Sequence, residues 1–339
     1  MMSFTLVSTT FNEINRLENS IQEIERQSLL PDKIIIVDAG STDGTFEKLK
    51  AWKNSSRISI EIILNPGCNV AKGRNQAISL SKTDLIASTD FGCRFHPDWL
   101  RSIIMPFTED SALEVVGGSF KVLEEDILNL PQKADYVLQN GYHLKIDEHF
   151  SVSSRSIAYR KYVWEEIGGY PEWLTLAADD TIFWRQIRKR NYSYRLIDKP
   201  YVFWMRHRTF KGFGKEAGRY GQGDGESGIN LRTYISHIIE SLLRYTLFLH
   251  VLIIPFYIHY TVLPLLFFIP QLFGLRSYKN ALSRWMKWRS KKFNFKVLFA
   301  CFRMIEISRY HYIKGYTKGL TSRDKSQSDA SRKLRTEIS

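Results

Sequence analysis

The stretch that decides the predicted fold is Lys82-Thr-Asp-Leu-Ile-Ala-Ser-Thr-Asp-Phe-Gly-Cys-Arg94. Residues 85–88 form an apolar run without a turn residue, which is typical of a short buried strand. Asp90 comes shortly after this run, and ligands of open α/β sheets bind at the carboxyl ends of the strands. We therefore expect Asp90 to hold a divalent cation that in turn holds a diphosphate. The alternative is an acid that only caps the helix predicted from Pro97.

Further strands and a helix are predicted on either side of this stretch. Residues 4–8 are apolar and β-branched, and Lys33-Ile-Ile-Ile-Val-Asp38 is a continuous apolar run of the kind found in strands buried on both faces. Between them, apolar residues recur at helical spacing at Ile14, Leu17, Ile21 and Ile24. Strands are also predicted over residues 58–64 and 115–122. This alternation predicts an α/β fold with a mainly parallel central sheet.

The loop after the second strand reads Asp38-Ala-Gly-Ser-Thr-Asp-Gly-Thr45, with two glycines that allow a sharp turn. Asp38 and Asp43 could accept hydrogen bonds from a nucleobase or a ribose there, or the loop could only cap the following helix. Arg74, in the first turns of the next predicted helix, is suited to bidentate phosphate contacts. A solvated surface arginine is the alternative at that position.

Four motifs follow one another in the chain: Ile34-Ile-Ile-Val-Asp-Ala-Gly-Ser-Thr-Asp-Gly-Thr45, Ala71-Lys-Gly-Arg-Asn-Gln-Ala77, Thr89-Asp-Phe-Gly-Cys93 and Pro97-Asp-Trp-Leu100. Their order and spacing, over residues 1–215, resemble the family 2 glycosyltransferases with a GT-A fold. The resemblance implies a Rossmann-like nucleotide-sugar-binding domain that moves a sugar from a nucleotide-diphosphate sugar to an acceptor hydroxyl. It also implies inversion at the anomeric carbon and a place in cell-surface glycan or polysaccharide biosynthesis. A non-catalytic, membrane-bound nucleotide-sugar-binding subunit is the alternative.

The resemblance further implies roles for individual residues. After Ile167-Gly-Gly-Tyr170, the pair Asp179-Asp180 opens a predicted helix, and its second acid, Asp180, is expected to be the general base. Two acids at a helix start are alternatively explained by the helix dipole alone. Nucleotide-sugar binding is assigned to residues along the chain: Thr10, Asn12, Glu13, Asp38, Asp43, Arg74, Thr89, Asp90, Gly92, Asp179, Arg206 and Arg208.

A divalent cation, Mn²⁺ or Mg²⁺, is the expected cofactor, although one acid of the usual pattern is missing. Many relatives carry Asp-x-Asp where this chain has Asp90-Phe-Gly92. Asp90 either binds the cation itself or contacts ribose while the cation takes other ligands. His207 is the candidate second ligand, and a structural histidine is the alternative. A basic cluster is expected to close over the diphosphate, ahead of a glycine-rich mobile loop or plain linker over residues 212–228: Arg206, Arg208 and Lys211.

The formal charge of +13 resides in the carboxyl-terminal part of the chain. Residues 276–339 contain 17 Lys and Arg against 4 Asp and Glu, so the first 275 residues balance to zero. Such a basic segment suits anionic lipid or nucleic acid. Directly before it, residues 245–275 are 31 consecutive uncharged positions, where a membrane-spanning helix needs about 20. A tilted span, a re-entrant hairpin, an interfacial helix pair and a buried soluble helix are the alternatives for this segment.

These features predict a GT-A domain over residues 1–230, a disordered basic tail over residues 321–339, and a helical membrane-associated region between them. That region combines the hydrophobic residues 245–275 with a basic amphipathic part, residues 276–320. The expected partners are a nucleotide-diphosphate sugar donor, a glycan or lipid-linked acceptor and an anionic membrane. Nucleic acid is not expected, and a homo-oligomer is left open. A re-entrant or interfacial attachment would keep the tail and the catalytic domain on the cytoplasmic side of the cell membrane.

Overall fold

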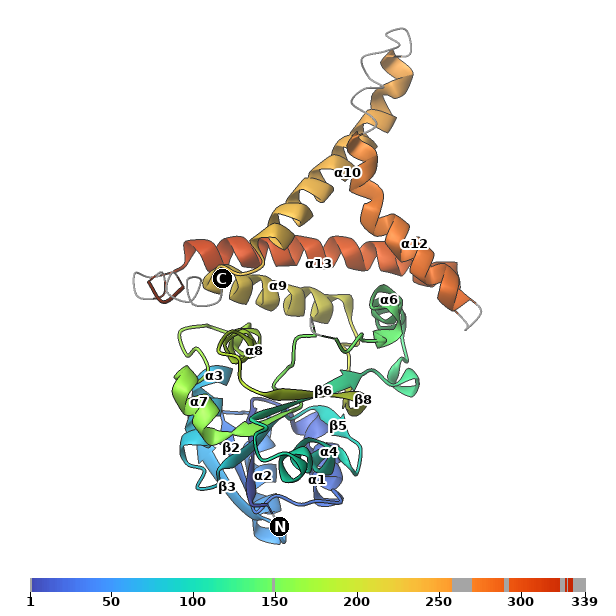
Figure 1. The fold of residues 1–339 in the computed structure, drawn as a ribbon. Coiled ribbons are helices and arrows are strands. Elements are labelled where there is room, and N and C mark those ends of the chain that lie inside the picture. Colours follow the sequence, from blue (N-terminus) through green and yellow to red (C-terminus); the bar gives the residue numbers. More distant parts are fainter. Residues whose placement is uncertain are drawn as a thin grey trace. The chain divides into compact units, whose positions relative to one another are not determined.

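The computed structural model describes residues 2–147, 150–257, 270–289, 293–323, 327 and 329–331 of the 339-residue chain (Figure 1). The chain divides into two compact units. Unit 1 comprises residues 1–126, 143–205 and 329–339, and unit 2 comprises residues 127–142 and 206–328. The division near residue 206 differs from the expected boundary at residue 230, because the chain just after residue 206 packs with the helices of unit 2.

Unit 1 is built on one sheet of eight strands in the order β3-β2-β1-β4-β7-β6-β8-β5. β3, β2, β1 and β4 are parallel neighbours, β7 runs antiparallel to β4 and β6, β6 and β8 are parallel, and β5 is antiparallel to β8. The prediction of a mainly parallel α/β sheet is therefore confirmed. The strands are β1 (Phe4–Thr10), β2 (Lys33–Asp38), β3 (Ser59–Leu64), β4 (Leu85–Asp90), β5 (Cys93–Phe95), β6 (Val115–Lys121), β7 (Ile157–Arg160) and β8 (Tyr194–Trp204).

Strand β2 explains why helices cover both faces of this sheet. Ile34 and Ile36 belong to one buried apolar cluster, whereas Ile35 and Val37 belong to another. Side chains alternate across a strand, so four successive buried residues require a cover on each face. One cluster contains residues of α1 (Ile14–Glu25), α2 (Thr45–Ser55) and α4 (Trp99–Ile104), and the other contains residues of α3 (Val70–Ser79), α7 (Lys161–Ile167) and α8 (Asp179–Lys189).

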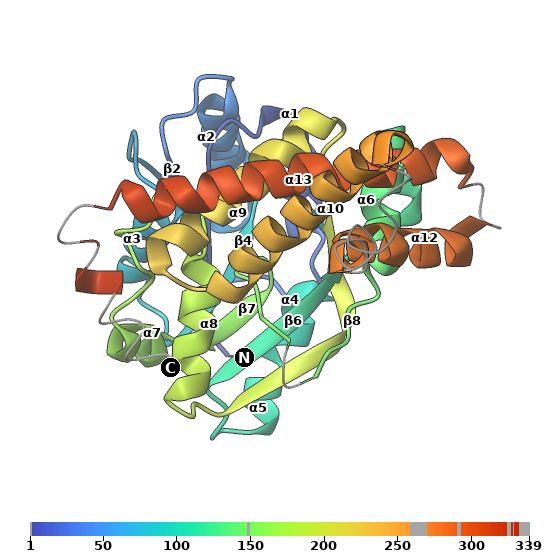
Figure 2. The ribbon, with the colours of Figure 1, turned by 90° about the horizontal axis from the view of Figure 1, so that it is seen from above.

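Unit 2 is helical, and its most extensive packing is between two helices that lie side by side in both views (Figures 1 and 2). These two helices are α9 (Phe210–Ser227) and α13 (Phe295–Thr321). Helix α6 packs on α12 and α13, and α10 contacts the turn η3 that precedes α12. The bounds of these elements are α6 (Leu130–Leu138), α10 (Leu231–Tyr257), η3 (Phe273–Leu275) and α12 (Arg276–Trp288). Shorter elements of the chain are α5 (Pro106–Glu109), η1 (Glu124–Asp126) and η2 (Asn140–Tyr142).

Helix α9 contains most of the glycine-rich stretch, so the prediction of a mobile loop or plain linker over residues 212–228 is wrong. The glycines allow the backbones of α9 and α13 to approach closely. A methyl group on Gly221 would overlap the carbonyl group of Tyr312, and one on Gly315 would overlap the carbonyl oxygen of Gly218. Tertiary packing of this kind offsets the low helix propensity of glycine. The sequence pattern reflects only the low propensity, because the packing partner lies elsewhere in the chain.

Replacing Gly221 by alanine is expected to lower the free energy of unfolding by about 1–3 kcal/mol, because the new methyl group meets backbone that cannot rotate away. Gly218→Ala is the matched control. Its methyl group would lie 3.6 Å from the carbonyl oxygen of His311, an ordinary contact. Alanine also favours a helix interior over glycine by about 0.5–1 kcal/mol. Urea unfolding compares the two variants, and an equal or higher midpoint for Gly221→Ala would contradict the close helix contact.

Helix α10 contains the first part of the uncharged segment 245–275. Residues 258–269 of that segment lie outside the described residues, so its predicted membrane forms stay predictions. Among the helices that the structure describes, none is both long enough and apolar enough to cross a membrane. Most of the tail predicted to be disordered, residues 321–339, also lies outside the described part of the chain.

Candidate functional site

The carboxyl ends of three parallel strands bring the first predicted site residues to one edge of the sheet. In the ladder between β1 and β4, Thr9 pairs with Asp90, and in the ladder between β1 and β2, Thr10 pairs with Asp38. The placement of Asp90 at the end of β4 follows from the apolar run before it. This edge is where an open α/β sheet binds ligands.

Arg74, in helix α3, forms ion pairs with two acids of this site. Its Nη2 donates to Asp90 Oδ1 at 2.9 Å, and its Nη1 donates to Asp179 Oδ2 at 2.5 Å. The Arg74 side chain is only 2% exposed. Burial disfavours the charged guanidinium, but the nearby carboxylates outweigh burial and raise the pKa of Arg74 above its usual value. The alternative of a solvated surface arginine is therefore wrong. Both terminal nitrogens of Arg74 contact the site's own acids, and its contact with a phosphate stays a prediction.

The two acids at the start of α8 differ in their surroundings. Asp179 is buried against Arg74, and burial raises its pKa to about 6, although the charge of Arg74 opposes that rise. Asp180 is half-buried, and its Oδ2 accepts a hydrogen bond from Ser153 Oγ at 3.0 Å. Its Oδ1 accepts from the backbone N–H of Thr181 at 2.8 Å. Asp180 is thus the acid of the pair that a substrate can reach.

Arg155 joins this group, and the sequence reasoning missed it. Its Nε lies 3.9 Å from Asp90 Oδ2, and its Nη1 donates to Ser153 Oγ at 2.9 Å. Because Ser153 in turn donates to Asp180, Arg155 stands between the acid of β4 and the acid of α8. A lone arginine in Ser153-Ser-Arg-Ser156 carries no spacing signal in the sequence, so only the fold identifies it.

Two loops at the same edge are held together by the predicted nucleotide-binding residues. Asp38 is fully buried, and its carboxylate accepts from the backbone N–H groups of Gly40 and Ser41 and from Ser41 Oγ. Asn12 Oδ1 accepts from the N–H of Thr42, and Asp43 accepts from Ile14, which starts α1. These bonds give Asp38, Asp43 and Asn12 a role in ordering the loops, and their contact with a nucleotide stays a prediction.

Three further predicted residues lie at or just after the carboxyl ends of β1 and β4. Thr89 is buried, and its hydroxyl donates to the carbonyl oxygen of Arg155 at 2.8 Å. Thr10 is also buried, and its hydroxyl oxygen has no hydrogen-bond partner among the described residues. At Gly92, where φ is +94°, an added Cβ would lie 3.0 Å from Glu13 Oε2. The carboxylate of Glu13 therefore occupies the space beside the position where many relatives carry their second acid.

The basic residues predicted to close over a diphosphate belong to unit 2. Arg206 is buried there, and its guanidinium donates to the carboxylates of Asp135 and Glu216. Its predicted contact with a phosphate stays a prediction. Those two acids and Tyr142 outweigh burial and raise the pKa of Arg206. His207 Nε2 lies 3.7 Å from Glu216 Oε1, and Arg208 is exposed. The assignments of His207 to a metal and of Arg208 to a donor stay predictions.

The sheet edge offers two carboxylates to a divalent cation, and the use of this expected cofactor stays a prediction. In the described part of the chain, no group of three or more His, Cys, Asp and Glu side chains is arranged to hold a metal. Mg²⁺, however, is usually bound by one or two carboxylates together with substrate phosphates. Asp90, whose side chain is 35% exposed, and Glu13 beside Gly92 are carboxylates of this kind.

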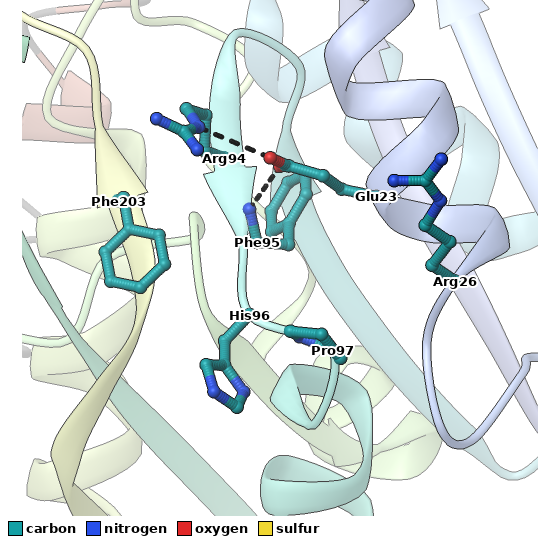
Figure 3. A pocket seen from close by; sticks show the side chains of 7 residues that line it. All are labelled: Glu23, Arg26, Arg94, Phe95, His96, Pro97 and Phe203. Carbon is teal, nitrogen blue, oxygen red and sulfur yellow. Dashed lines mark hydrogen bonds and ion pairs between the residues drawn. The ribbon is translucent and has the colours of Figure 1, made fainter.

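A separate pocket of unit 1 contains none of the predicted site residues (Figure 3). Its polar centre is Glu23, which accepts from the backbone N–H of Phe95 at 2.6 Å and from Arg94 Nε at 3.3 Å. These groups satisfy one another, and the predicted site residues near Asp90 lie outside this pocket. The pocket is lined by Glu23, Arg26, Arg94, Phe95, His96, Pro97 and Phe203.

Comparison with known proteins identifies a family model that matches part of the chain. Residues 5–168 match the family model described as Glycosyl transferase family 2. This range contains the loop at Asp38, Arg74 and the end of β4 at Asp90. The acids of α8 come after it.

Several known proteins are similar to this chain, among them two curated relatives and one solved structure. O-antigen chain rhamnosyltransferase RfbN from Salmonella typhimurium is 26% identical over 187 residues, which are 52% of this chain and 59% of the relative. Validoxylamine A glucosyltransferase from Streptomyces hygroscopicus subsp. limoneus is 26% identical over 116 residues, 34% of this chain and 26% of the relative. The chain thus spans less than two thirds of the length of either relative.

The solved structure is mannosyltransferase PcManGT from Pyrobaculum calidifontis, in complex with GDP-Man and Mn²⁺. Its TM-score is 0.56 at 13% identity, over 95% of this chain and 88% of that one. This likeness concerns the fold. The mixed α/β architecture with its largely parallel sheet is consistent with the expected GT-A fold.

Proposed function

We propose that the protein is a glycosyltransferase that moves a sugar from a nucleotide-diphosphate sugar to an acceptor hydroxyl, in glycan or polysaccharide biosynthesis. The proposal rests most on the position of the partly exposed Asp180. Two hydrogen bonds through Ser153 connect its carboxylate to Arg155, and the Arg155 guanidinium lies 3.9 Å from Asp90. The family match over residues 5–168 supports it, as do the glycosyltransferase activities for which the two curated relatives are named.

The chemistry has two requirements, a base for the acceptor and positive charge for the leaving diphosphate. Asp180 would take the proton of the acceptor hydroxyl while the acceptor oxygen bonds to the anomeric carbon. The bond from that carbon to the diphosphate breaks, and its electron pair leaves with the diphosphate. One displacement of this kind inverts the anomeric carbon. A divalent cation held by Asp90 and Glu13 would supply further positive charge to the diphosphate when bound.

Attachment to the cytoplasmic face of the cell membrane is the second part of the proposal. Helix α10 exposes a row of apolar side chains at helical spacing, and residues 276–339 are basic. Apolar contact together with lysine and arginine binds an anionic membrane surface. The exposed row is Leu231, Ile235, Ile239, Leu242, Tyr245, Leu249 and Leu252.

Flotation with vesicles tests this attachment. The full chain is expected to float with vesicles that contain anionic phosphatidylglycerol, and less with neutral phosphatidylcholine. The double variant Leu242→Glu, Leu249→Glu is expected to lose most of that binding, because it places two charges on the apolar row. Leu64→Glu, at an exposed leucine of unit 1, is the matched control. Equal flotation of the double variant and the control would contradict attachment through α10.

Nucleotide binding and turnover test the transferase proposal. Purified protein is heated with UDP, GDP or dTDP, with and without Mn²⁺ or Mg²⁺, since a ligand that binds the folded state raises Tm. Sugar conjugates of the diphosphate that binds are then supplied with candidate acceptors, and release of free diphosphate is measured. No stabilisation by any of the three diphosphates would contradict the proposal. Binding without release would favour a non-catalytic binding subunit.

A further inference from the structure

Arg155 occupies a central position among the charged groups of unit 1. Its guanidinium lies beside Asp90 on one side, at 3.9 Å, and donates to Ser153 on the other, at 2.9 Å. Ser153 donates onward to the carboxylate of Asp180 at 3.0 Å. Arg155 and Ser153 therefore connect Asp90 to Asp180, the proposed base.

The position of Arg155 is fixed by its neighbours. Its guanidinium lies over the ring of Trp204, 4.2 Å from the ring centroid, and 5.7 Å from the centroid of Phe120. Its carbonyl oxygen accepts the hydroxyl hydrogen bond of Thr89, which ties the residue to the end of β4. A planar guanidinium stacked on an aromatic ring loses little further freedom when it binds an anion.

Arg155 is more exposed to solvent than Arg74, the other arginine at this edge. The side chain of Arg155 is 18% exposed, whereas that of Arg74 is 2% exposed and gives both terminal nitrogens to acids. A ligand at the sheet edge can therefore touch Arg155 but not Arg74. Guanidinium groups bind phosphate oxygens through two parallel N–H donors, a geometry that suits a diphosphate.

We propose that Arg155 binds the diphosphate of the nucleotide-sugar donor and so links donor binding to Asp180. This inference rests on the proposed transferase function. During transfer, the bond between the anomeric carbon and the diphosphate oxygen breaks, and the electron pair stays on the diphosphate. The acceptor oxygen forms the new bond, and its proton passes to Asp180. Arg155 keeps its charge throughout and donates N–H groups to the oxygens on which negative charge grows.

Titration calorimetry with two classes of nucleotide tests this role. The probes are UDP, GDP and dTDP, each with its monophosphate. Arg155→Met is expected to lower the affinity for the bound diphosphate by about tenfold or more, since a hydrogen bond to a charged group is lost. The affinity for the matching monophosphate should change much less. Arg155→Lys keeps the charge but loses the paired donors, and it is expected to recover part of the diphosphate affinity.

Arg195→Met is the matched control, because it removes one positive charge from an exposed ion pair with Glu109 in the same unit. It should leave both affinities unchanged. Wild-type-like diphosphate binding by Arg155→Met or an equal loss for mono- and diphosphates would overturn the role of Arg155 and leave the transferase proposal standing. If Arg155→Met does not fold, Arg155→Lys decides, and unchanged diphosphate affinity in that variant overturns the inference. A wild-type chain that binds none of the nucleotides would overturn both proposals.

Discussion

Replacing Asp180 by asparagine is expected to lower the rate of sugar transfer by about 10²–10⁴-fold, the usual contribution of a general base. Asparagine has nearly the same shape and can still accept the hydrogen bond from Ser153 Oγ, but it cannot take a proton. Binding of the nucleoside diphosphate should therefore stay close to that of the wild type. The loss should appear in kcat, because a base acts on the acceptor in the transition state.

The measurement is initial-rate kinetics of diphosphate release together with calorimetry of diphosphate binding. Asp198→Asn, at an exposed position of unit 1, is the matched control and should transfer at the wild-type rate. Equal rates for Asp180→Asn and the wild type would remove Asp180 from the mechanism. A parallel loss of diphosphate affinity would instead indicate that Asp180 shapes the donor site.

Replacing Arg74 by methionine is expected to destabilise the protein by about 3–5 kcal/mol, because removing one partner of a buried ion pair leaves an uncompensated charge. Asp179 would remain buried without a cation, and Asp90 would lose its 2.9 Å partner. The expected readout is a lower midpoint of urea unfolding. Donor binding should also weaken, since the acids at the sheet edge would no longer be held in place.

Two further variants separate charge from packing in this prediction. Arg74→Met combined with Asp179→Asn should be more stable than Arg74→Met alone, because the second substitution removes the unpaired charge. Arg57→Met is the surface control, since its side chain is 70% exposed and its pair with Glu25 spans 4.0 Å. Exposed pairs of this kind contribute about 0–1 kcal/mol. A double variant no more stable than Arg74→Met would show that packing, and not charge, sets the loss.

The parts of the fold that depend on short-range patterns could be predicted. The apolar runs that became β2 and β4 have strand length, and the burial of β2 on both faces follows from its four successive apolar residues, 34–37. Asp90 was placed at the sheet edge because it comes at the end of such a run. The glycine-rich residues 212–228 could not be predicted in this way, since their helix depends on contact with α13, which comes much later in the chain.

The sequence by itself predicted the order of strands β1 to β4 and β6 with helices α1 to α4, and the acids that end β4 and begin α8, because side-chain period and strand ends are local properties. Strands β5, β7 and β8 were not predicted from it. Only the tertiary structure decided which of those acids is accessible to a ligand. Arg74 and Asp179 are 105 residues apart in the chain, and their ion pair withdraws both from the surface. Asp180 and Arg155 stay partly exposed at the same edge of the sheet. The sequence could not separate these residues, because ionic partners are selected by proximity in space and not by spacing along the chain.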